Sequence, residues 1–193
     1  PRPHISLDDC YAIVAPGVEE LAAAELRALG LLPTAVEAGG VSFRAGAPGL
    51  YAANLHLRTV SRVVVRIATF RAATFFELER HAKRVPWDAM LSAERGARFH
   101  VTSRKSRLYH QRAIEQRLAA AIGKAAVEGT QEGQLFVVRV FRDLFTISAD
   151  ASGELLHRRG YRLASAKAPL RETLAAAMLL DAGWDGTAPL LDP

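Results

Sequence analysis

The sequence predicts an α+β fold whose first part, residues 11–70, follows the order β-α-β-β-α-β. Three observations predict it. Short apolar runs are bounded by turn residues, apolar residues recur at helical spacing after the first run, and a Gly39-Gly40 pair separates two strand-like segments. This element order is that of a ferredoxin-like split βαβ unit.

The first strand is predicted over residues 11–14, an apolar run that stops at a Pro-Gly turn. A helix follows over residues 18–29, where apolar side chains recur every three or four positions. Glu19 and Glu20 lie in its first turn, where the helix dipole favours anions, and Gly30 follows its last apolar residue as a C-cap. These signals predict an amphipathic helix packed on a sheet.

The Gly39-Gly40 pair predicts a hairpin between strands over residues 34–38 and 41–44. A second helix is predicted over residues 48–57, and a valine-rich strand over residues 62–69 completes the unit.

The middle of the chain predicts a helix over 75–84, a strand over 98–103, a helix over 109–126, and strands over 135–141 and 144–149. In the strand over 98–103 apolar and polar positions alternate, which predicts a half-buried strand with a basic outer face.

The last segment differs from the rest. A helix predicted over residues 170–180 is apolar nearly all round, which is typical of a helix buried on several sides in a larger protein. Residues 189–193 are interpreted as the start of a buried strand. We therefore expect these segments to open a further domain that the chain carries only in part. We expect the helix to fold back on the body, to pair with a second copy or to be locally disordered.

The net charge of +5 is concentrated in one region of the 193-residue chain. Residues 58–117 carry a net charge of +9, whereas the flanking parts are slightly acidic. Clustered positive charge suggests a polyanion partner, although a solvated arginine-rich surface is the alternative. The absence of a long apolar run or a signal peptide, together with the single cysteine, Cys10, predicts a cytoplasmic protein with no membrane partner.

The densest candidate site joins the basic strand to the N-terminus of the next helix. Arginine side chains and helix-end N–H groups suit phosphate, aromatic rings can stack on unpaired bases, and serine hydroxyls can reach phosphate or sugar. The predicted RNA-binding residues here are Arg98, Ser103, Arg104, Lys105, Arg107, Tyr109, His110 and Arg112. The alternative is a polar loop with a helix cap.

A second basic cluster, residues 157–162, contains Arg158 and Arg159, which are also predicted RNA contacts. This cluster can equally be a linker that docks two domains. Elsewhere no catalytic set is found: the six histidines lack metal-ligand spacing, and Cys10 is interpreted as a packing residue. Trp87 and Trp184 are interpreted as core residues. We therefore predict no catalytic residue and no metal site in this chain.

Several motifs together carry a family resemblance. They are Ala-Pro-Gly-Val-Glu-Glu-Leu at 15–21, Gly-Gly-Val at 39–41, His-Arg-Arg-Gly-Tyr-Arg at 157–162, Ala-Pro-Leu-Arg-Glu-Thr-Leu-Ala-Ala-Ala at 168–177, Gly-Trp at 183–184 and Pro-Leu-Leu-Asp-Pro at 189–193. With them the chain resembles the N-terminal part of bacterial THUMP-domain class I methyltransferases. These enzymes modify guanine N2 in 23S ribosomal RNA and were formerly described as N6-adenine-specific DNA methylases.

The resemblance implies a ferredoxin-like region over 1–48, extending structurally to about residue 70, and a THUMP RNA-binding domain over 49–160. It also implies a linker and the start of a truncated Rossmann-like methyltransferase domain over 161–193. The implied partners are structured RNA, above all 23S ribosomal RNA, and the rest of the methyltransferase domain in cis.

The cofactor that the resemblance implies is S-adenosylmethionine. Its implied contacts within this chain are Leu170, Arg171, Glu172, Thr173 and Asp192. The family's glycine-rich cofactor loop follows the Asp-Pro pair at which this sequence stops, so we expect the chain alone to be inactive. A stand-alone THUMP RNA-binding adaptor and a transfer RNA guanine-N2 methyltransferase are the alternatives.

Overall fold

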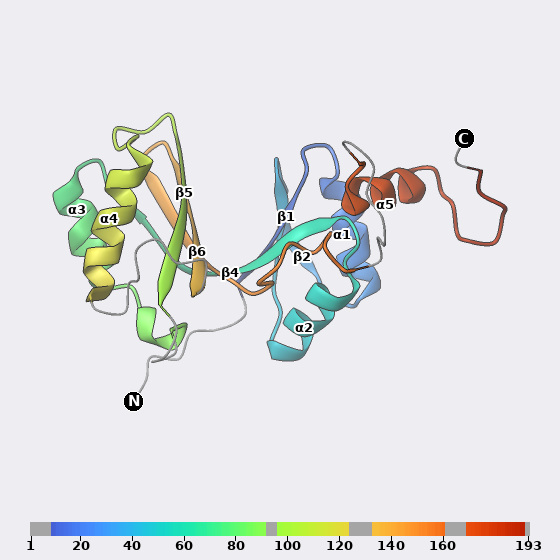
Figure 1. The fold of residues 1–193 in the computed structure, drawn as a ribbon, viewed down its shortest axis with the longest axis horizontal. Helices are drawn as coiled ribbons and strands as arrows, with labels where there is room; N and C mark the ends of the chain where they lie inside the picture. Colours follow the sequence, from blue (N-terminus) through green and yellow to red (C-terminus); the bar gives the residue numbers. More distant parts are fainter. Residues whose placement is uncertain (1–8, 92–95, 124–132, 161–168, 192–193) are drawn as a thin grey trace. The chain divides into compact units, whose positions relative to one another are not determined.

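The computed structural model describes residues 9–91, 96–123, 133–160 and 169–191. Its strands follow the hydrogen-bonded order β2-β3-β1-β4-β7-β6-β5 (Figure 1). The chain divides into two compact units, one formed by residues 10–63 and 151–193 and the other by residues 1–9 and 64–150. We call them the α1–α2 unit and the α3–α4 unit after their helices.

The β-α-β-β-α-β order predicted for the first part is confirmed. Its elements are β1 (Cys10–Val14), α1 (Glu19–Ala28), β2 (Pro33–Glu37), β3 (Gly40–Phe43), α2 (Ala47–His56) and β4 (Val60–Arg71). β3 pairs antiparallel with both β1 and β2. The buried side chains of Leu26, Phe43 and Leu57 contribute to the core, and Cys10 is buried as a packing residue.

A buried carboxylate fixes the end of α2 against α1. Glu25 accepts hydrogen bonds from the backbone N–H groups of Arg58 and Thr59, from the Arg58 Nε at 2.8 Å and from the Thr59 hydroxyl at 2.7 Å. Because a buried carboxylate is costly unless it is paired and hydrogen-bonded, these donors explain why a charged residue is tolerated on the core side of α1.

The α3–α4 unit contains the remaining elements of the middle region. They are α3 (Phe75–Ala82), the short 3₁₀ helix η1 (Trp87–Ala89), β5 (Ala97–Arg104), α4 (Gln111–Ile122), β6 (Gln134–Phe141) and β7 (Leu144–Asp150). β5 runs parallel to β6, β6 pairs antiparallel with β7, and β7 pairs antiparallel with β4. Leu78 of α3 and Ile114 and Leu118 of α4 share a buried cluster with Phe136 and Phe145 of the sheet. The helices therefore cover one face of this sheet.

Local signals explain the element boundaries in this unit. Thr74 and Glu77 form a capping box at the start of α3. α4 begins at Gln111 rather than at Tyr109 because His110 has extended backbone. The end predicted for that helix, at residue 126, lies outside the described residues. Trp87 is buried, as predicted, and its indole N–H donates to the Ala82 carbonyl.

The C-terminal segment corrects two predictions. Trp184 is a half-exposed residue rather than a core residue, and its indole N–H donates to the nearby Ala188 carbonyl. Residues 189–191 form no strand, and the side chains of Leu190 and Leu191 are exposed. This segment follows α5 (Glu172–Asp181), which contacts α1 but leaves Met178 in solvent.

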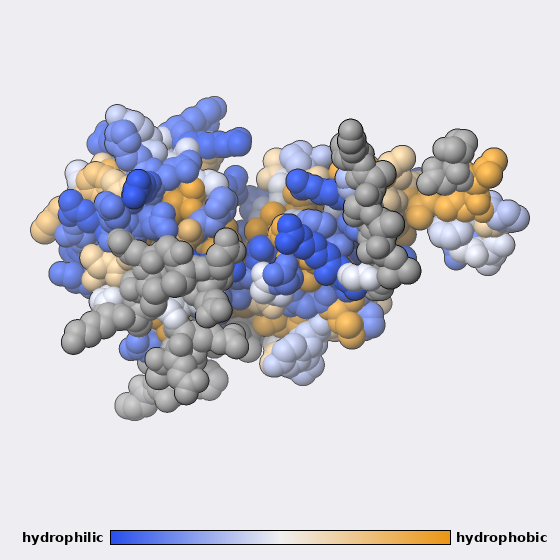
Figure 2. Space-filling model, viewed as in Figure 1, coloured by the Kyte–Doolittle hydropathy of each residue, from blue (hydrophilic) through white to orange (hydrophobic). Residues whose placement is uncertain are grey.

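Figure 2 shows both hydrophobic and hydrophilic surface on the segment after α5. Self-association through this surface stays a prediction. Within the described ranges, none of the helices has the length and apolar character that a membrane span requires.

Glu19 joins the start of α1 to the β2–β3 turn. Its carboxylate accepts hydrogen bonds from the N–H groups of Gly39 and Gly17, each at 2.8 Å. These bonds, with that from Gly39 the strongest influence, lower the pKa of Glu19 below its ordinary value of 4.5.

A group whose folded pKa is lowered stabilises the protein above its unfolded pKa, and this stabilisation is lost as the pH falls through the folded pKa. We therefore expect Glu19→Gln to be less stable than the parent at neutral pH, with the difference shrinking below pH 4.5. Urea unfolding over a pH series measures it. Glu20→Gln, one position along the same helix turn, is the control. A difference between Glu19→Gln and the parent that does not change with pH would contradict the prediction.

Candidate nucleic-acid interface

The loop between β5 and α4 is hydrogen-bonded to the turn between β6 and β7. Asp143 Oδ1 accepts the Arg107 backbone N–H at 2.8 Å, and the Asp143 backbone N–H donates to Ser106 Oγ at 3.1 Å. The Ser106 hydroxyl in turn donates to the Arg104 carbonyl at 2.9 Å. Asp143 thus holds the basic loop against the hairpin turn.

Ser103 closes the same loop from within, because its hydroxyl donates to the Leu108 carbonyl at 2.7 Å. We therefore interpret Ser103, one of the predicted RNA contacts, as a residue that positions the loop.

Three residues of this region have left-handed backbone: Lys105 with φ 52°, Arg142 with φ 50° and Asp143 with φ 62°. This conformation costs about 1–2 kcal/mol for a residue with a side chain. Arg142 and Asp143 are the two central residues of the hairpin, where the right-handed strand twist favours turns with two positive φ angles. The loop and the turn are therefore held in a fixed and strained shape, as is common at functional sites.

The turn and the loop bring cations from distant parts of the chain together. We call them the hairpin-end cluster: Arg71, Arg104, Lys105, Arg107 and Arg142. Arg104, Phe141, Leu144 and Arg71 follow one another across β5, β6, β7 and β4 in register. The Arg71 guanidinium donates to the Arg142 carbonyl at 3.1 Å.

Asp143 neutralises little of this charge. Its carboxylate lies 3.9 Å from the Arg107 Nε, and the Arg107 side chain is largely exposed. An exposed ion pair of this kind contributes little, so the Arg107 cation stays available to a ligand. Sequence reasoning missed Arg71 and Arg142 because strand pairing alone places them here. The paired strands around Arg142-Asp143 were the signal that could have located Arg142.

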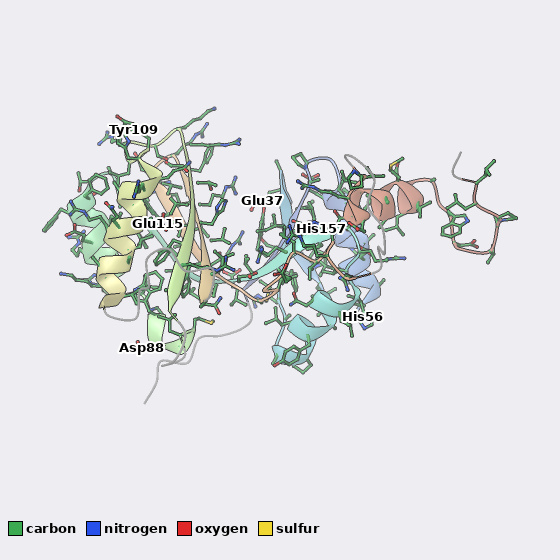
Figure 3. The ribbon with its side chains drawn as sticks, viewed as in Figure 1. Glu37, His56, Asp88, Tyr109, Glu115 and His157 are labelled. Atoms are coloured by element: carbon green, nitrogen blue, oxygen red, sulfur yellow. The ribbon has the colours of Figure 1, made fainter. Side chains whose placement is uncertain are left out.

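The start of α4 adds aromatic and helix-end groups to this end of the unit. Tyr109 is 65% exposed, and its ring lies 4.2 Å from the His110 ring between centroids. Figure 3 shows Tyr109 at one end of the α3–α4 unit and Asp88 at the other. His110 caps the helix without a side-chain hydrogen bond, Arg112 is exposed, and the first turn carries no acidic residue. Such a helix start suits an anion.

Arg98 does not join this cluster. It lies six positions before Arg104 on β5, which places it about 20 Å away along the strand. Its side chain is partly buried, and within the described residues its buried Nε has no hydrogen-bond partner. Arg98 and the hairpin-end cluster therefore lie at opposite ends of this strand.

The two arginines of the second predicted basic cluster have different partners. The Arg159 guanidinium donates to the carbonyls of Leu57 at 2.7 Å, of Asn54 at 3.1 Å and of Leu55, and its Nε donates to Leu156. These are the free carbonyls at the C-terminal end of α2, where a cation is favoured. Arg159 thus anchors the segment after β7 to the end of α2 within the α1–α2 unit, and whether this cluster docks two domains stays a prediction. Arg158 is exposed beside Glu154.

The residues implied to contact the cofactor form one short segment at the start of α5. Leu170 and Arg171 are exposed, Glu172 is half-exposed and Thr173 is buried. A nucleoside-sized cofactor needs contacts from more than one segment. These residues therefore do not form a complete cofactor site by themselves, and Asp192 lies outside the described residues. Among the residues that the structure describes, no group of side chains is suited to hold a metal ion.

Family models match both ends of the chain. Residues 9–64 match the "RlmL ferredoxin-like domain", and residues 159–193 match the "RMKL-like, methyltransferase domain". The chain is 34% identical to a Synechocystis protein named "Putative RNA methyltransferase slr0064", over 95% of this chain and 50% of that protein. It is also 35% identical to the "Ribosomal RNA large subunit methyltransferase K/L" of Syntrophotalea carbinolica, over 90% of this chain and 26% of that protein.

Solved structures agree with these matches. A Listeria monocytogenes protein described as a "predicted N6-adenine-specific DNA methylase" superposes with a TM-score of 0.83 at 33% identity, over 92% of this chain and 49% of that chain. SMU.472, solved in complex with SAH, superposes with a TM-score of 0.83 at 28% identity, over 98% of this chain and 52% of that chain.

The comparisons confirm the resemblance to this methyltransferase family and support S-adenosylmethionine as the family's cofactor. The chain spans about half or less of the length of these relatives.

The two arginines of the second basic cluster offer a direct comparison. Arg159→Ala is expected to lower the free energy of unfolding of the α1–α2 unit by about 1.5–3 kcal/mol, because the carbonyls at the end of α2 lose a charged donor. Arg158→Ala removes the same charge from an exposed ion pair and is expected to cost less than about 0.5 kcal/mol. Urea unfolding, with hydrogen exchange of the α2 amides, tests both. Equal stability of the two variants would contradict this anchoring of the segment after β7 to α2.

Proposed function

We propose that this chain is the RNA-binding N-terminal portion of an S-adenosylmethionine-dependent methyltransferase that modifies guanine N2 in large-subunit ribosomal RNA. The observation that carries the proposal is the hairpin-end cluster, in which five cations from β4, from the end of β5, from the β5–α4 loop and from the β6–β7 turn lie at one end of the sheet. An exposed group of arginine and lysine side chains on a rigid frame fits the phosphates of structured RNA.

The α3–α4 unit is the RNA-binding module in this proposal, and we propose that it is the THUMP domain. Its sheet holds the cations in place, so that little ordering is needed when phosphates bind. Phosphate contacts fix the position and orientation of the RNA but carry little sequence information. The methyltransferase domain therefore selects the target base in this proposal. Residues 159–193 are similar to part of such a domain.

The proposed chemistry explains why the enzyme needs an RNA-binding domain separate from its methyltransferase domain. A guanine inside a helix must be extruded or already unpaired before an enzyme can reach it, and its weakly nucleophilic amine must be aligned with the methyl donor. S-adenosylmethionine supplies the methyl group when it is bound by the complete domain. In this chain, Leu170, Arg171, Glu172 and Thr173 would form one edge of that site.

RNA binding by the hairpin-end cluster should depend steeply on salt. The triple variant Arg104→Ala/Lys105→Ala/Arg107→Ala removes exposed side chains but keeps the backbone bonds of the loop. It should bind a structured fragment of large-subunit ribosomal RNA more weakly. The slope of log K against log salt should fall by about 0.7–0.9 for each phosphate that the variant no longer neutralises.

The matched control is Arg27→Ala/Arg44→Ala/Lys83→Ala, which removes the same charge from exposed positions outside the cluster. It should lower the affinity much less than the loop variant. Fluorescence anisotropy over a salt series measures both affinities. Equal binding by the loop variant and the parent would remove the support for this interface.

Methyl transfer tests the second part of the proposal. The 193-residue chain should transfer no methyl group from S-adenosylmethionine to ribosomal RNA, because the four of its five candidate cofactor residues that the structure describes lie on one segment. A longer protein that contains this chain together with a complete methyltransferase domain should produce N2-methylguanine. Mass spectrometry of digested RNA reads out both reactions. N6-methyladenine as the only product would contradict the assignment.

A further inference from the structure

Phe141 stands out on the sheet face of the α3–α4 unit that the helices do not cover. It is the last residue of β6, opposite Arg104 on one side and Leu144 on the other, and its side chain is 38% exposed. Its neighbour Val140 is buried on the helix-covered face. Because a single exposed apolar residue is ordinary, the side chains that surround the ring decide what it can bind.

Two guanidinium groups accompany the Phe141 ring. The Arg142 Cζ lies 5.2 Å from the ring centroid, and the Arg139 Cζ lies 5.9 Å from it. Within the described residues neither guanidinium has a hydrogen bond or an ion pair. Both cations are therefore available to phosphate oxygens beside the ring.

The backbone that presents Arg142 is held from both sides. Its N–H donates to the Arg104 carbonyl at 3.4 Å, and its own carbonyl accepts the Arg71 guanidinium at 3.1 Å. Its left-handed φ of 50° is unusual for an arginine. A strained residue held by neighbours on two other strands is expected where a fixed side-chain position is needed.

We propose that Phe141, Arg139 and Arg142 form a stacking site for an unpaired base of single-stranded RNA, an inference that rests on the proposed RNA-binding function. An exposed ring stacks on the face of any base, and bases inside a duplex do not offer that face. Arg139 and Arg142 contact the phosphates on either side of the stacked base. The hairpin-end cluster binds the strand that continues from it.

The experiment uses the 193-residue chain, a short unstructured RNA that carries 2-aminopurine, and the same strand annealed to its complement. Phe141→Ala should weaken binding of the single strand by about 5- to 100-fold and abolish the quenching of 2-aminopurine that stacking causes. Its salt slope should not change, because the substitution removes no charge. Arg139→Ala/Arg142→Ala should lower that slope.

Further variants separate stacking from loss of fold. Phe141→Leu keeps an apolar side chain at this position and should bind as weakly as Phe141→Ala, whereas Phe141→Trp should restore binding and quenching. Phe76→Ala is the matched control, because Phe76 is a 74% exposed phenylalanine on α3 of the same unit. It should bind the single strand like the parent.

Equal binding by Phe141→Ala and Phe76→Ala, or equal affinity of the parent for the single strand and the duplex, would overturn the stacking site. If the loop variant Arg104→Ala/Lys105→Ala/Arg107→Ala still weakens RNA binding in that case, the proposed function stands without the stacking site. If the parent binds no RNA, both proposals fail together.

Discussion

The candidate interface depends on the hydrogen bonds of one residue, Asp143. Its carboxylate and its backbone N–H tie the β5–α4 loop to the β6–β7 turn. Without these bonds the loop would keep only the weak bond from the Arg142 N–H to the Arg104 carbonyl, and the mutual repulsion of the surrounding cations would favour a more open arrangement. The carboxylate neutralises little of the charge and leaves the Arg107 side chain in solvent. One acidic residue thus positions the basic loop beside the hairpin turn mainly through its hydrogen bonds.

The sheet supplies the rigidity that this arrangement needs. Four strands of the α3–α4 unit pair continuously from β5 to β4, and the helix-covered face is filled by buried apolar side chains such as Phe136 and Phe145. Close-packed cores of this kind deform little. The strained backbone at Lys105 and Arg142 can persist only because the surrounding strands hold it. The cations, and the proposed stacking ring beside them, are therefore presented in fixed positions.

Burial and partners, rather than residue type, decide what each arginine does. Arg159 has four carbonyl partners, three at the end of α2 and one, Leu156, in the segment after β7, and it acts as a structural residue there. Arg58 pairs with the buried Glu25. Arg104 and Arg139, in contrast, lie exposed on the open sheet face. The positive charge that the sequence concentrates between residues 58 and 117 therefore serves both the fold and the candidate interface.

The sequence by itself determined the β-α-β-β-α-β order, the Gly39-Gly40 hairpin and the basic loop between β5 and α4. Each depends on local periodicity, turn chemistry or neighbouring residues. Only the tertiary structure showed that Arg71 and Arg142 lie beside that loop and that Arg98 lies far from it. It also showed that Arg159 binds the carbonyls at the end of α2. These outcomes depend on strand pairing and on hydrogen bonds between residues far apart in sequence, such as Arg107 with Asp143 and Arg71 with Arg142. Such contacts leave no period or motif in a single sequence, because either partner can lie anywhere along the chain.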